Sequence, residues 1–162
     1  MRKGSQETLH IDTGPLTLTE PMPLVGSWLA LEDVQPLSGE FQFVPGSHRL
    51  PEPLHYGTDK GHHGDHGEYY KVLTATLGMC EERGLRTESF RAKKGDVLIW
   101  HGDLMHGGAP IEDPTSTRQS LIAHLTPLGV MPTMFNFSGS ARSPTPRVGT
   151  PSMSHGATWS PR

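Results

Sequence analysis

Two histidines and one carboxylate have the types and spacing that hold a transition-metal ion. His10 and Asp12 are two positions apart, so in an extended segment both side chains point to the same side. His106 follows 94 positions after Asp12, so only a folded sheet brings it to the pair. Two imidazoles and one carboxylate occupy one face of an iron(II) ion and leave three positions open. These three residues are therefore the candidate catalytic and metal-binding residues.

A fourth residue has the chemistry to hold a carboxylate. Arg118 stands twelve positions after His106, and its guanidinium is a planar, permanently charged fork suited to a carboxylate. Ser120, two positions further on, points to the same side of an extended segment. We expect Arg118 and Ser120 to act together.

The segments that must position these residues show mainly the pattern of strands. Five of them are apolar or alternate with period two and end at turn residues: residues 24–31, 40–44, 87–91, 96–100 and 119–125. In the first segment, Trp28 and Ala30 share one face, and Leu29 and Leu31 share the other. The 19 glycines and 15 prolines supply the turns that a sandwich or barrel of short strands requires. We therefore expect a mainly β fold.

One segment, residues 66–83, has helical spacing instead. Its apolar residues recur at intervals of three or four positions: Tyr69, Leu73, Leu77 and Cys80. Asp65 with Glu68 makes a capping-box-like start, and Gly84 can end the helix. We expect this helix to be an insertion between strands, packed on the outside of the sheet.

The composition indicates one cytoplasmic domain without a nucleic-acid or membrane partner. The 162 residues suffice for one domain, and mixed charges that sum to −3 give no basic footprint for nucleic acid. Cys80 is the only cysteine, which excludes an internal disulfide and suits a reducing compartment. The chain begins with polar residues rather than a signal peptide, and no stretch approaches the roughly 18 apolar residues of a membrane span. The oligomeric state stays open.

Three further motifs follow His10-Ile11-Asp12 in order. They are LVGSWLALED at residues 24–33, VPGSHR at residues 44–49 and KGDVLIWHGDLMHGG at residues 94–108. Together the four motifs closely resemble the bacterial branch of the phytanoyl-CoA dioxygenase family, which are iron(II)- and 2-oxoglutarate-dependent oxygenases. The resemblance covers roughly residues 5 to 127. It implies a double-stranded β-helix (jelly-roll, cupin-like) core with the metal at its mouth.

The resemblance also implies a role for each candidate residue. The iron(II) ligands would be His10, Asp12 and His106. The co-substrate 2-oxoglutarate would chelate the ion through its keto acid and bind Arg118 and Ser120 through its distal carboxylate. Trp28 would line the co-substrate pocket, with a buried core aromatic as the alternative. Dioxygen would take the last coordination position, and ascorbate would stimulate turnover.

The implied reaction is the hydroxylation of a small organic molecule with release of succinate and carbon dioxide. Halogenating members of the wider superfamily carry Ala or Gly at the position of the carboxylate ligand, which leaves room for chloride. Here Asp12 fills that position. We therefore expect oxygen rather than a halide to be transferred.

The chain departs from the family before His10. Only nine residues precede it, where relatives carry a long stretch with the first core strand and part of the substrate pocket. We therefore expect a jelly roll that is incomplete at the N-terminus, and the substrate stays open. The alternative function is a truncated, catalytically incompetent fragment or pseudoenzyme that retains metal binding. A cupin-like metal-binding module is a third hypothesis, against which Trp28 and Arg118 argue.

Two segments lie apart from the candidate site. Residues 1–127 form the expected core domain, and residues 128–162, rich in Pro, Ser, Thr and Gly, are expected to be disordered. That composition buries too little apolar surface to offset the entropy of ordering. The histidine-rich residues 55–66 are expected to form an exposed loop before the helix. A lid and a second metal site are the alternatives for this loop.

Overall fold

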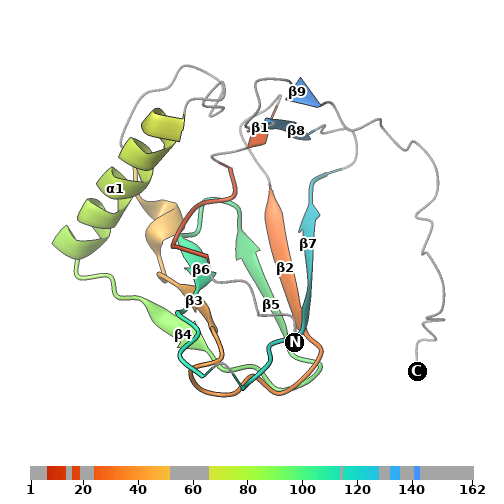
Figure 1. Ribbon diagram of the computed structural model, residues 1–162. Helices are drawn as coiled ribbons and strands as arrows, with labels where there is room; N and C mark the ends of the chain where they lie inside the picture. The colour runs from red at the N-terminus through yellow and green to blue at the C-terminus, as the bar shows by residue number, and fades with distance from the viewer. Residues whose placement is uncertain are drawn as a thin grey trace.

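The computed structural model describes residues 7–13, 16–18, 24–51, 66–113, 115–127, 132–135 and 141–142. Within these ranges the elements follow in the order β1 (Leu16–Leu18), β2 (Val25–Ala30), β3 (Phe41–Phe43), the short 3₁₀ helix η1 (Ser47–Arg49), α1 (His66–Glu82), β4 (Glu88–Phe90), β5 (Val97–His101), β6 (His106–Gly108), β7 (Ser120–Leu125), β8 (Pro132–Phe135) and β9 (Ala141–Arg142). The fold is mainly β, as the sequence predicts (Figure 1).

Two antiparallel sheets of three strands form the body of the fold. One has the order β5-β2-β7 and the other the order β4-β3-β6. The hydrophobic core lies between them, because β2 and β5 contribute buried side chains from one sheet and β3 contributes them from the other. A third, small sheet joins β1, β8 and β9.

Strand β2 is buried on one face because its residues alternate as the sequence predicts. Trp28 and Ala30 are each 1% exposed, whereas Leu31, just beyond the strand, is 43% exposed. Burial of a large apolar side chain contributes about 1.5–3 kcal/mol to folding, so this alternation fixes which face of β2 meets the second sheet.

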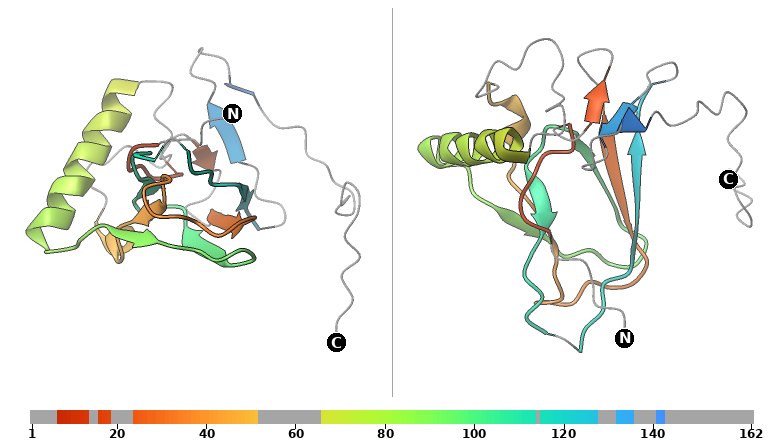
Figure 2. Two further views of the ribbon diagram at one scale, coloured as in Figure 1. Left: turned by 60° about the horizontal axis from the view of Figure 1, so that its bottom comes forward. Right: turned by 45° about the horizontal axis from the view of Figure 1, so that its top comes forward.

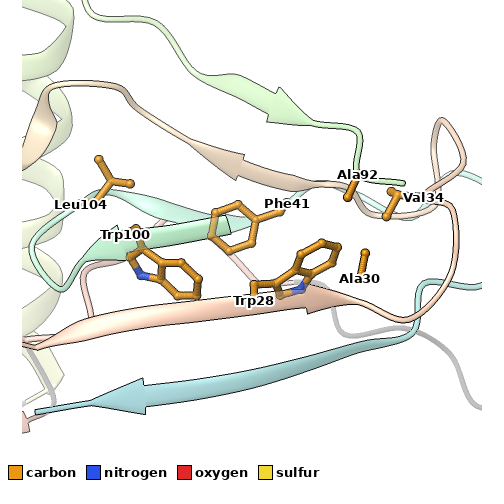
Figure 3. Close-up of a cluster of buried hydrophobic side chains, with 7 residues drawn as sticks. All are labelled: Trp28, Ala30, Val34, Phe41, Ala92, Trp100 and Leu104. Carbon is orange, nitrogen blue, oxygen red and sulfur yellow. The ribbon is translucent and has the colours of Figure 1, made fainter. Parts of the chain in front are cut away.

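Aromatic rings fill the space between the two sheets (Figure 3). The ring of Phe41 lies 6.1 Å from that of Trp28 and 5.0 Å from that of Trp100. Phe41 also stacks on His106, with centroids 5.5 Å apart and the planes 10° from parallel. Ring pairs at such separations each contribute about 0.5–1.5 kcal/mol beyond area burial. The core is therefore continuous with the candidate ligand His106.

Helix α1 lies between β3 and β4 in the chain, as the sequence predicts. Its Leu73 and Cys80 are buried against Val44 and Met105, and Figures 1 and 2 show α1 on the side of β3, β4 and β6 away from β2. Gly84 takes the left-handed conformation at φ 68° that ends the helix. In the described part of the chain, no helix has the length and apolarity needed to cross a membrane.

Gly78→Ala is expected to raise the free energy of unfolding by about 0.5–1 kcal/mol, because glycine costs about that much relative to alanine inside a helix. Gly78 lies within α1, and a Cβ atom added there meets no atom within 4 Å. Chemical denaturation of the variant and the wild type measures the difference. A loss of stability would contradict the open surroundings of this position.

Two expectations need correction. The five strands expected from the sequence do not include residues 106–108, but His106 begins a separate strand, β6, that pairs with β3. Disorder was expected throughout residues 128–162, but Pro132–Phe135 and Ala141–Arg142 form β8 and β9. These strands satisfy their backbone groups by pairing, β8 with β1 and β9 with β8. Most of the histidine-rich loop, residues 55–65, lies outside the described residues, as does the capping residue Asp65.

Candidate metal centre

Backbone pairing brings His10 beside His106. His10 forms an antiparallel bridge with His106, in which the His10 N–H donates to the His106 carbonyl at 2.8 Å and the reverse bond is 2.9 Å long. The next strand residues continue this contact, since the Gly108 N–H donates to the Glu7 carbonyl at 2.8 Å. The segment that carries His10 therefore depends on β6 for its place.

Asp12 is held by backbone bonds to the turn after β5. Its N–H donates to the Gly102 carbonyl at 2.9 Å, and the Gly102 N–H donates to the Leu24 carbonyl at 2.7 Å. The neighbouring Thr13 hydroxyl donates to the Asp103 carboxylate. These bonds place the Asp12 side chain, which is buried, beside both histidines.

The three side chains form one cluster. Asp12 Oδ1 lies 3.8 Å from His10 Nε2 and 3.6 Å from His106 Nε2, and one donor atom of each residue lies within 4.8 Å of the other two. Donors at right angles on one ion, with bonds of about 2.0–2.2 Å, lie about 3 Å apart. The three donors are therefore gathered at one place, and the Asp12 oxygen and the two histidine nitrogens would each have to come closer by less than about 1 Å to share one divalent ion.

The tautomers of both histidines suit a metal. His10 Nδ1 lies 2.9 Å from the Thr8 carbonyl, and His106 Nδ1 lies 2.8 Å from the Leu104 carbonyl. A carbonyl only accepts, so each Nδ1 carries the proton and each Nε2 presents a lone pair. Backbone carbonyls that bind the outer nitrogen of a metal-ligating histidine fix its ring in this way.

Charge and burial act in opposite directions in the cluster. Burial raises the pKa of Asp12, but a hydrogen bond with His124, the charges of His106 and His124 and a hydrogen bond from Trp100 outweigh it, so that pKa is lowered. Burial lowers the pKa of His106 despite the attraction of Asp12. The cluster thus favours an ionised carboxylate beside a neutral imidazole, and these are the protonation states that bind metal.

Two contacts to Asp12 were not predicted from the sequence. The Trp100 indole Nε1–H donates to Asp12 Oδ2 at 2.9 Å, and His124 Nε2 lies 3.2 Å from Asp12 Oδ1. The hydrogen bond with Asp12 raises the pKa of His124. The alternation of residues 119–125 was the available signal, because it places His124 on the same face as Ser120.

The residues expected to bind the co-substrate lie toward the end of the sheet away from the His10–Asp12–His106 cluster. Ser120 pairs with Ala30 and His124 pairs with Gly26, so the two lie about 13 Å apart along β7 at roughly 3.3 Å per residue. Arg118, just before β7, donates a guanidinium N–H to the Gly39 carbonyl, and burial lowers its pKa against the attraction of Glu40 and Glu7. Trp28 lies between the ends, where its burial matches the core alternative.

A two-sheet β fold with two histidines and one carboxylate at one end of its core has the donor set of non-haem iron(II) enzymes. Residues 2–118 match the family described as Phytanoyl-CoA dioxygenase (PhyH). The match covers more than half of the chain, so the chain belongs to this family. No match is found among curated protein sequences.

Solved structures share the fold. The chain is similar to the non-haem alpha-ketoglutarate-dependent epimerase SnoN from nogalamycin biosynthesis, at 22% identity and a TM-score of 0.55, over 82% of this chain and 45% of that one. The carbocyclase SnoK from nogalamycin biosynthesis is also non-haem and alpha-ketoglutarate-dependent. It matches at 24% identity and a TM-score of 0.54, over 79% of this chain and 46% of that one.

A further structure is of SnoN in complex with Fe3+, alpha ketoglutarate and nogalamycin RO. It matches at 17% identity and a TM-score of 0.53, over 99% of this chain and 57% of that one. The chain thus spans about half the length of these proteins. At these identities the likeness shows a shared fold.

Proposed function

We propose that the chain is an iron(II)- and 2-oxoglutarate-dependent dioxygenase that hydroxylates a small organic molecule. The observation that carries the proposal is the convergence of two histidine Nε2 atoms on Asp12 Oδ1, at 3.8 and 3.6 Å. Such a cluster leaves three positions of a six-coordinate ion open, two for a keto acid and one for dioxygen. The two sheets would then be the described part of a jelly roll.

Each element of the site has a task in this proposal. His10 and His106 hold the ion through neutral imidazoles, and Asp12 adds the negative charge that offsets part of the charge of iron(II). When bound, the ion supplies the redox chemistry that couples decarboxylation of 2-oxoglutarate, to succinate and carbon dioxide, to oxidation of the substrate. The buried aromatic rings of Phe41 and Trp100 shield the His106 side from water.

Arg118 is proposed to bind the distal carboxylate of 2-oxoglutarate, with Ser120 beside it and Trp28 along the path. A keto acid bound at the cluster would extend down the inner face of the sheet, and the arginine side chain would reach toward it. Burial disfavours the charge of Arg118, and a carboxylate offsets that cost through a charge-assisted bond.

Oxygen transfer rather than halogenation follows from the carboxylate. Asp12 occupies the position that a halide would need, and its charge repels an anion. The small-molecule substrate, the use of dioxygen and a stimulation by ascorbate are part of the same proposal. SnoN and SnoK are described as an epimerase and a carbocyclase, so analysis of the substrate product decides between hydroxylation and these outcomes.

The test is the formation of succinate from 2-oxoglutarate by the 162-residue chain with iron(II), ascorbate and dioxygen. Slow, metal-dependent succinate formation is expected even without the substrate, and Asp12→Asn should abolish it. If the wild-type chain binds the metal but forms no more succinate than Asp12→Asn, the proposal that the chain turns over 2-oxoglutarate is contradicted. That outcome favours the second candidate, a metal-binding chain without activity.

Arg118→Ala is expected to weaken 2-oxoglutarate binding by about 10- to 150-fold, since a hydrogen bond to a charged group contributes roughly 1.5–3 kcal/mol. Metal affinity should change less than about threefold, because Arg118 lies far along β7 from the ligands. Calorimetric titration of metal and then of co-substrate measures both. Arg91→Ala, an exposed arginine, is the control, and an equal loss of both affinities in Arg118→Ala would contradict the assignment.

A further inference from the structure

We propose that Trp100 is a positioning residue that makes Asp12 a metal ligand through one oxygen atom only, and so keeps a third coordination position open. The inference deepens the proposed function and rests on it, because it requires an ion held by Asp12 and the two histidines. Trp100 touches neither the reacting atoms nor the co-substrate in this role. It acts through the carboxylate.

The two oxygens of the Asp12 carboxylate have different surroundings. Oδ1 faces the Nε2 atoms of His10 and His106 and lies 3.2 Å from His124 Nε2. Oδ2 instead accepts a bond of 2.9 Å from Trp100 Nε1. Trp100 is 5% exposed and Asp12 7%, so water does not compete readily for either partner. The indole has one N–H and no other polar group. Turning Oδ2 toward the ion would leave that buried donor without a partner, which is unfavourable.

The number of carboxylate oxygens on the ion decides how many positions remain. Two imidazoles and one oxygen leave three of six positions, which suffice for a chelating keto acid and dioxygen. Two imidazoles and two oxygens leave two, which the keto acid alone would fill. With the hydrogen bond from Trp100, the site has room for both the keto acid and dioxygen. Without it, the site would have room for the keto acid only.

Gly26 is the second component of this device. Trp100 pairs with Gly26 across the β5–β2 ladder, and a Cβ atom at position 26 would lie 2.1 Å from Trp100 Cε2 and 2.6 Å from Nε1. Real side-chain atoms do not come this close. The indole edge that carries the N–H therefore fits against position 26 only because glycine has no side chain there. The rings of Phe41 and His106, at 5.0 and 4.9 Å, confine the indole further.

The test compares variants that remove the donor with variants that do not. In Trp100→Phe the N–H is lost, and replacement of Trp100 by benzothienylalanine removes the N–H while it keeps the shape of the indole. Gly26→Ala should displace the same donor from the opposite side. Phe90→Leu, which changes an aromatic side chain packed against the same core, is the matched control. The readouts are the affinity for Co(II), the Co(II) absorption spectrum as a report of coordination number, the affinity of the Co(II)-loaded chain for 2-oxoglutarate, and thermal unfolding.

Loss of the N–H should weaken Co(II) binding about 10- to 100-fold, the range for bonds that orient a ligand, and change the Co(II) spectrum. Phe90→Leu should shift Co(II) binding less than about threefold. The Co(II)-loaded benzothienylalanine chain should still bind 2-oxoglutarate, because two positions remain for the keto acid. If that chain matches the wild type in Co(II) affinity and spectrum, the hydrogen bond has no such role and the inference is overturned, while the proposed function stands. If the wild type binds no Co(II), both are overturned.

Discussion

Asp12→Asn is expected to lower the affinity for iron(II) or Co(II) by at least about a hundredfold, because loss of a group that merely orients a ligand already costs 10- to 100-fold. The amide removes the negative charge that faces both histidine Nε2 atoms, at 3.8 and 3.6 Å. Its shape stays close to that of the carboxylate, so the backbone bonds from Asp12 to Gly102 are retained. Anaerobic calorimetric titration measures the affinity.

The matched control is Asp33→Asn. Asp33 is a carboxylate beyond the opposite end of β2, where it accepts bonds from the Lys94 N–H and the Lys93 side chain. Its replacement should leave metal affinity within about threefold of the wild type, since residues far apart without shared partners act independently. Equal metal affinity in Asp12→Asn and the wild type would show that Asp12 is not a metal ligand.

Gly107→Ala is expected to lower the free energy of unfolding by about 1–3 kcal/mol, the usual cost of an added group in a packed site. It should also weaken metal binding, because a Cβ atom at position 107 would lie 2.6 Å from the Glu7 carbonyl oxygen and 2.9 Å from that of Thr8. Both contacts are with backbone, so the segment that carries His10 must move away from β6. The bridge between His10 and His106 would then open.

Gly78→Ala serves as the control for Gly107→Ala, because its added methyl group meets no neighbour. Denaturation curves should show a gain of stability over the wild type in Gly78→Ala and a loss in Gly107→Ala. Metal titrations should show weaker binding in Gly107→Ala than in Gly78→Ala. A Gly107→Ala chain with the stability and metal affinity of the wild type would show that residues 7–10 do not depend on β6 for their position.

The sequence alone was sufficient for most strands and for the helix, because each has a repeating apolar pattern. Alternation in residues 24–31 predicts β2 and a shared face for Trp28 and Ala30, and helical spacing predicts α1. Strand β6 was not predictable in this way. Its sequence, His106-Gly107-Gly108, has no alternating apolar pattern and two glycines that disfavour strands. Its pairing with β3 on one side and the His10 segment on the other decides its conformation.

The candidate site was predictable as residue types but not as contacts. The spacing of His10 and Asp12, with the resemblance, led to the cluster that the structure brings together. The hydrogen bond from Trp100 to Asp12 depends on the register that sets Trp100 opposite Gly26, and register is a property of the paired sheet. The approach of His124 to Asp12 likewise requires β7 beside β2.

The central claim is that His10, Asp12 and His106 hold an ion with open positions for a keto acid. The most direct measurement compares the binding of 2-oxoglutarate and glutarate to the chain, anaerobically, with and without iron(II). Glutarate has both carboxylates but lacks the keto oxygen that closes the chelate. The account predicts that iron(II) strengthens binding of 2-oxoglutarate far more than that of glutarate, and that Asp12→Asn removes this preference. Equal affinities for the two diacids, unchanged by iron(II), would contradict it.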